Sequence, residues 1–136
     1  MKSRESLIRL KQFQVDEKRR QVAQIEMMIE DFERMAKDLD DQIVAEQERT
    51  GIHDVTHFAY PTFAKAAMQR RDNLKTSVDD LQQQLDDARD QFAEAVEELK
   101  KVELLEERDQ ERERENAARV EQAALDETGL QRSMRR

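Results

Sequence analysis

Apolar residues recur every seven positions along two stretches of this 136-residue chain. In the first stretch, the repeat and further apolar positions three residues on have the a and d spacing of a coiled-coil seam. Its members are Ile8, Val15, Val22, Ile29, Ala36 and Ile43 at a, with Ile25, Phe32 and Leu39 at d. This pattern predicts a long helix over about residues 3–49, with Ser3 as a candidate N-cap.

The second stretch carries an apolar repeat of matching length that ends before Asp109. Its members are Ala67, Leu74, Leu81, Ala88, Ala95 and Val102, with Val78, Leu85, Phe92 and Leu99 interleaved. This predicts a second helix over about residues 61–127. Two seams of equal length can bury each other, so the predicted fold is all-α, a long two-helix antiparallel coiled-coil hairpin.

The segment between the two stretches predicts a turn over residues 50–60. Gly51 suits the left-handed conformation that ends many helices, and Pro61 suits the first turn of the helix that follows. If Ile43 lies beside Ala67, residue i pairs with about residue 110 − i. The second helix then continues past the first as an overhanging C-terminal helix, and residues 128–136 are predicted to be a disordered tail of this single domain.

Charge favours the antiparallel arrangement independently of the apolar pattern. Residues 1–20 hold seven basic and three acidic side chains, whereas residues 76–107 hold three basic and eleven acidic ones. These two segments meet in an antiparallel hairpin. In a parallel dimer each would instead lie against its own copy, where like charges repel.

The composition bounds the function classes. Hydrophobic residues make up 37% of the chain and charged residues 41%, which is too polar for a thick core. The net charge of −8 argues against general affinity for nucleic acid. No cysteine is present, and no apolar run reaches the length of a membrane span. We therefore expect a cytoplasmic protein. The chain has two glycines, which is too few for a glycine-rich phosphate-binding loop. We therefore expect neither an enzyme nor a bound cofactor.

The predicted turn contains the residues that most resemble a site. His53 and His57 lie four apart, but the glycine and the proline around them favour a polar loop over a metal site. Phe58, Tyr60 and Phe63 either plug the end of the hairpin, which we favour, or form an exposed aromatic anchor for another protein.

Three further features concern the helices. Met27, Met28 and Met35 flank the first seam, either as packing at the core edge or as an adaptable docking face. Lys11 and Lys18 occupy d positions and should weaken the seam near the termini. The charged overhang after Glu106 is either a solvated helix end or a segment that binds a partner.

Two segments carry a resemblance to a known family. The opening MKSRESLIRLKQFQVDEKRRQVAQIE and the turn HFAYPTFAKAAMQRRDNL resemble the flagellar type III export protein FliJ, particularly its alphaproteobacterial forms. The likeness implies a coiled coil that associates with the export ATPase, contacts the cytoplasmic part of the export gate and assists export chaperones. It also implies a location peripheral to the inner-membrane base of the flagellum. By this likeness the termini would face the ATPase ring and the turn would face the gate.

The candidate partner-binding residues follow from the same likeness and from the charge pattern. They fall in the turn half, namely Leu39, Phe58, Tyr60 and Phe63, and in the overhang, namely Arg108, Arg112, Arg114, Arg119 and Val120. Two other functions remain open: a structural coiled coil that assembles with itself, and a chaperone that holds unfolded clients on its methionine and aromatic edges.

Overall fold

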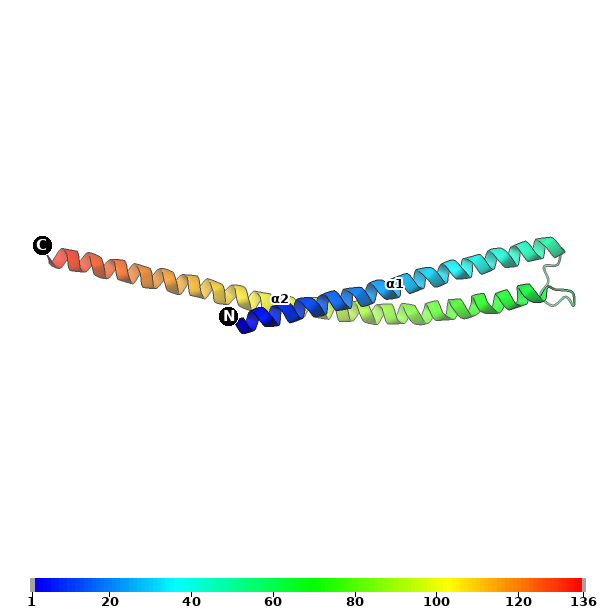
Figure 1. Ribbon diagram of the computed structural model, residues 1–136, viewed down its shortest axis with the longest axis horizontal. Coiled ribbons are helices and arrows are strands. Elements are labelled where there is room, and N and C mark those ends of the chain that lie inside the picture. Colours follow the sequence, from blue (N-terminus) through cyan, green and yellow to red (C-terminus); the bar gives the residue numbers. More distant parts are fainter. Residues whose placement is uncertain (1, 136) are drawn as a thin grey trace. The chain divides into compact units, whose positions relative to one another are not determined.

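A computed structural model of the chain describes the backbone of residues 2–135 and the side chains of residues 4–135. Two long helices, α1 (Lys2–Thr50) and α2 (Thr62–Met134), are joined by a loop over residues 51–61 (Figure 1). The chain divides into two compact units. Unit 1 combines Met1–Gln14 with Ala95–Arg136, and unit 2 is Val15–Glu94. Each is described by itself below.

Unit 2 is a pair of antiparallel helices with a single apolar seam. One buried cluster joins Ile29 of α1 to Leu81 and Leu85 of α2. A second cluster joins Leu39 and Ile43 to Ala67. Both clusters obey the 110 − i relation, and every apolar residue of the two predicted tracks is buried or half-buried. The all-α fold of two long antiparallel helices is confirmed.

Charged contacts across unit 2 support the same orientation. The Arg71 guanidinium lies 3.0 Å from Asp40 Oδ1, and Arg89 lies 3.6 Å from Glu26. The Arg19 guanidinium stands 5.6 Å from the centre of the Phe92 ring, which is within range of a cation–π contact. Exposed ion pairs contribute about 0–1 kcal/mol each, so they select the orientation and the apolar seam supplies the stability.

In unit 1 the helices share fewer buried apolar residues than in unit 2, and more of their contacts are ion pairs. Among the described residues of this unit, Ala95 is the one buried apolar side chain. Arg4, at a d position, lies 3.4 Å from Glu106 Oε2 and also donates a hydrogen bond to Asp109. Lys11, the next d residue, lies 2.9 Å from Glu98 Oε2. Where the predicted seam becomes basic, ion pairs therefore replace apolar contacts.

The loop that joins the helices begins as predicted. Gly51 has a φ of 71°, and its N–H donates to the Gln47 carbonyl at 2.8 Å. A residue with a Cβ is strained in this left-handed conformation, which explains a glycine here. At the other end Pro61 precedes α2, because its carbonyl accepts the first helical hydrogen bond from the Lys65 N–H at 3.2 Å.

The helix ends correct the sequence prediction. α1 already includes Lys2, and the side chain of Ser3, the candidate N-cap, lies outside the described residues. α2 continues as one helix to Met134, whereas we expected it to end near residue 127 before a disordered tail. The overhang is thus the end of α2, and the described residues form no separate third helix. One glycine inside a helix costs only about 1 kcal/mol, so Gly129 does not stop it.

Candidate functional site

The four candidate residues near the loop differ in whether they can meet a partner. Leu39 is buried in the seam, and Tyr60 is only 5% exposed. Gln47 Nε2 donates a hydrogen bond to the Tyr60 hydroxyl at 2.9 Å, and that hydroxyl lies 4.0 Å from Met68 Sδ. Tyr60 therefore joins the loop to both helices and closes the apolar seam of unit 2 at this end.

The other two candidates face solvent. Phe58 is 96% exposed and Phe63 is 56% exposed. The Phe58 ring stacks on the neighbouring His57 ring, with centroids 4.7 Å apart. Plugging and exposure, which the sequence presented as alternatives, thus apply to different aromatic residues. Tyr60 plugs the seam, while Phe58 is displayed at the loop surface.

Hydrogen bonds within the loop hold it in shape. Asp54 Oδ1 accepts from the Thr56 N–H at 2.9 Å and from the Thr56 hydroxyl at 2.7 Å, and these bonds lower the pKa of Asp54. His57 Nδ1 accepts from the Ala59 N–H at 3.0 Å. Within the part of the chain that the structure describes, no three acidic, histidine or cysteine side chains gather to hold a metal. The loop therefore exposes an aromatic side chain, Phe58, while hydrogen bonds of its polar residues fix the backbone.

Substituting the two aromatic residues separates these roles. We expect Tyr60→Phe to lower the free energy of unfolding by about 0.5–1.5 kcal/mol, because Gln47 loses its partner. Phe58→Ala should change it by less than about 0.5 kcal/mol, since the ring contacts little besides His57. Urea titrations followed by circular dichroism measure both. Equal losses from the two substitutions would contradict the assignment.

The methionines beside the first seam are half-exposed or more. Met35 lines a shallow groove of about 260 Å³ together with Phe32 and Leu74. Met27 and Met28 are exposed on the same helix. Met35 is therefore placed to take part in a docking face at this groove.

The overhang is the second candidate region. Every described residue from 110 to 135 is exposed, and Arg4, the first residue of α1 with a described side chain, reaches α2 at Asp109. Arg114 pairs with Glu111 at 3.1 Å and Arg119 with Glu115 at 3.7 Å, all within α2. Such pairs support a solvated helix by about 0.2–0.5 kcal/mol each. The other candidates of this region, Arg108, Arg112 and Val120, are likewise exposed.

The sequence comparison decides the family. The whole chain, residues 1–136, matches the family described as Flagellar FliJ protein. The chain belongs to the FliJ family. Neither a curated protein nor a solved structure matches it in the corresponding comparisons. FliJ proteins are non-enzymatic coiled-coil components of flagellar export, so the family supplies the function class that two helices alone could not.

The FliJ match leaves finer points as predictions. It does not distinguish bacterial lineages, so the alphaproteobacterial likeness stays a prediction. The described helices contain no stretch apolar and long enough to pass through a bilayer. Leu39 lies in a buried cluster of the seam and Tyr60 is buried at the end of the loop, whereas the candidates of the overhang, Arg108, Arg112, Arg114, Arg119 and Val120, lie along an exposed stretch of α2.

One ion pair of this FliJ chain has a testable pH dependence. The Arg4 guanidinium donates a hydrogen bond to Asp109 and holds the pKa of that carboxyl below its usual range. The folded-state pKa is below the unfolded one. The pair therefore stabilises unit 1 fully above the ordinary carboxyl pKa, and this is lost as the pH falls through the folded value.

Arg4→Gln should therefore raise the pKa of Asp109 toward its ordinary value. Carbon-13 NMR titration of the Asp109 carboxyl measures this. Arg9→Gln is the matched control, because Arg9 is exposed and makes no ion pair in the described part of the chain. A pKa of Asp109 that stays low in Arg4→Gln would contradict the contact.

Proposed function

We propose that this FliJ-family chain is a non-enzymatic stalk and adaptor of the flagellar type III export apparatus. It engages the export ATPase ring through the overhang and the export gate through the loop, and it assists export chaperones. It acts in the cytoplasm, at the inner-membrane base of the flagellum. The observation that carries the proposal is an exposed helix, residues 110–134, that extends beyond the paired part of unit 1 in a member of this family.

The overhang is chemically suited to a ring of repeated subunits. Its arginines and glutamates alternate, and its ion pairs lie along the helix surface where a partner can exchange them at little cost. Many weak charged contacts can hold a helix in a ring without locking it in one position. In this proposal Arg108, Arg112, Arg114 and Arg119 supply charge, and Val120 supplies an apolar contact. Binding of this kind weakens as salt rises.

The loop serves the gate in the same proposal. Phe58 and Phe63 are exposed and can enter a pocket on another protein, as aromatic anchors commonly do. Leu39 and Tyr60 act indirectly, because both are buried: Tyr60 holds the loop against α1 through its hydrogen bond with Gln47, and Leu39 packs in the seam between the helices. A substitution at Phe58 should therefore change gate binding without changing stability.

Two variants test the two contacts separately. A chain that ends at Asp109 keeps the Arg4 ion pair and should keep the helical circular-dichroism signal per residue of the paired region. It should lose binding to the purified export ATPase, and with it any stimulation of ATP hydrolysis, while it still binds the gate domain. Phe58→Ala should show the opposite selectivity. If the shortened chain binds the ATPase with unchanged affinity, the overhang is not the contact.

A further inference from the structure

Four half-exposed leucines lie outside the seam in the part of unit 1 where the two helices pair. Leu7 and Leu10 belong to α1, Leu104 and Leu105 belong to α2, and each is between 40% and 50% exposed. Single exposed leucines are normal on protein surfaces, but a group of them on one side is not. We refer to these four residues as the leucine patch.

The coiled-coil frame places the leucine patch on one side of unit 1. Leu7 directly precedes Ile8 at a, so it occupies the flanking g position. Leu105 occupies the same position in α2, directly before Glu106. The 3.4 Å contact between Arg4 and Glu106 fixes the register, so Leu7 lies level with about residue 103, two positions before Leu105 and on the same flank of the seam. Leu10 is three residues from Leu7 and extends the patch over the surface of α1.

Two cations border the patch on α2. Lys101 and Arg108 are four residues before and three residues after Leu105, so they lie on its side of the helix. With the two leucines of α2 they line a shallow groove of about 280 Å³. Neither cation takes part in an ion pair within the described part of the chain, although residues 76–107 are strongly acidic.

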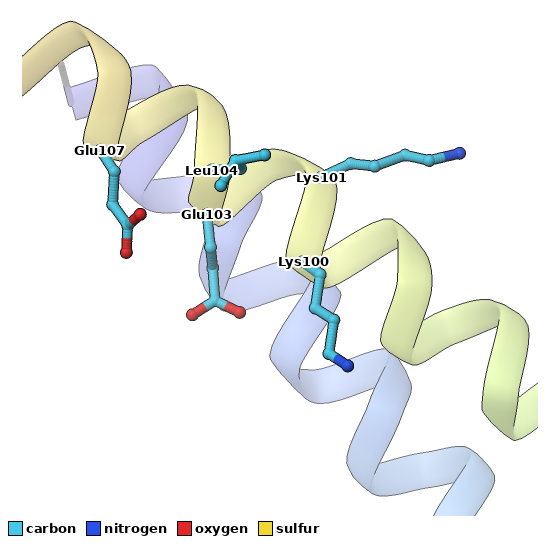
Figure 2. A pocket seen from close by; sticks show the side chains of 5 residues that line it. All are labelled: Lys100, Lys101, Glu103, Leu104 and Glu107. Atoms are coloured by element: carbon cyan, nitrogen blue, oxygen red, sulfur yellow. The ribbon is translucent and has the colours of Figure 1, made fainter.

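The neighbouring side of α2 has a different character. Lys101 and Leu104 point one way, whereas Lys100, Glu103 and Glu107 point another way and form a charged row (Figure 2). Lys100 and Lys101 are thus adjacent in sequence and carry the same charge, and both line one wide groove, but their side chains point in different directions. Of the five side chains in Figure 2, Lys101, which is unpaired among the described residues, points with Leu104, whereas the two carboxylates point with Lys100.

We propose that the leucine patch docks an acidic amphipathic helix of a partner protein. An apolar stripe on that helix would cover the four leucines, and carboxylates beside the stripe would meet Lys101 and Arg108. A basic helix would gain nothing from these cations. The inference rests on unit 1 alone. Arg108 is also assigned to the ATPase contact, but the four leucines and Lys101 are not, so the inference holds whether or not the overhang binds the ATPase.

A pair of synthetic helical peptides tests the proposal with the full-length protein. One carries a leucine stripe flanked by glutamates, and the other has lysines in place of the glutamates. Fluorescence anisotropy should show binding of the acidic peptide only. We expect Leu104→Ala with Leu105→Ala to weaken it about tenfold, and Lys101→Glu to weaken it about fivefold. Lys100→Glu, the matched control, should change it less than about twofold.

Several results would overturn the proposal. These are absence of binding by the acidic peptide, equal binding of the basic peptide, or equal losses in Lys100→Glu and Lys101→Glu. Sedimentation velocity addresses a second copy of this chain as the occupant. If the wild type forms a dimer that the two leucine substitutions dissociate, the patch is a self-association surface. Unchanged circular dichroism in each variant shows that the fold persists.

Discussion

Leu85→Ala is expected to lower the free energy of unfolding by about 2–4 kcal/mol. Leu85 is 4% exposed and packs with Ile29 and Leu81 in a buried cluster of unit 2. A two-helix core is one layer thick, so few neighbouring side chains can move in to fill the space that the substitution creates. A small domain has only about 5–15 kcal/mol of stability in total, so this single change removes a large share.

The same substitution at Leu105 is the matched control. Leu105→Ala makes an identical chemical change on the same helix at a half-exposed position. Its cost should stay below about 1 kcal/mol, because much of that side chain already contacts water. Chemical denaturation with far-ultraviolet circular dichroism compares the two variants. Similar losses would mean that the apolar seam does not hold unit 2 together.

The fold could be predicted from the sequence because a heptad repeat shows which face of each helix is buried against the other helix. The spacing from Ile8 to Ile43 identified one seam, and the opposite charges of residues 1–20 and 76–107 identified its orientation. Register followed from pairing Ile43 with Ala67, and the packed clusters agree with it. Period and charge are both local properties of a sequence, so no knowledge of distant contacts was needed.

The loop and the helix end were harder to predict for a physical reason. The loop has no period, so nothing in the spacing separates buried Tyr60 from exposed Phe58 two residues earlier. The decisive contact is a hydrogen bond from Gln47, which depends on the folded backbone. At the far end, Gly129 lies inside α2 and does not end it. The residues around it are good helix formers, and the preference of one glycine is too weak to outweigh them.

The leucine patch was not predicted because the search for a seam considered only the a and d positions, whereas the four leucines stand beside them. Leu104 and Leu105 are adjacent, and adjacent residues on a helix do not share the seam. A search for apolar residues at flanking positions of both helices would have found Leu7 and Leu105 together. The role of the cations could be recognised only in the structure, because Lys101 differs from Lys11 in having no ion pair among the described residues.

The two units therefore differ in what stabilises them. Buried apolar clusters hold unit 2, and its core continues up to Tyr60. Unit 1 combines one buried alanine with ion pairs of Arg4 and Lys11. Ion pairs near the surface are weak and screened by salt, so unit 1 should open at lower cost than unit 2. Opening there would release the first turns of α1 without unfolding the rest.

Replacing the two seam lysines should make the first half of α1 pack more stably against α2. Lys11→Leu with Lys18→Leu is expected to raise the free energy of unfolding by about 1–3 kcal/mol. Each leucine would restore an apolar d residue. The groups left behind, Glu98 and Gln91, are only partly covered and can return to water. Lys37→Leu, at an exposed position outside the seam, is the control and should change stability by less than about 0.5 kcal/mol.

Denaturation at low and high salt measures the effect and its cause. Wild-type protein should lose stability as salt rises, whereas the double variant should lose less, because the Lys11 ion pair is gone. Amide hydrogen exchange should slow in the first turns of α1. A double variant less stable than wild type would mean that these lysines stabilise the seam.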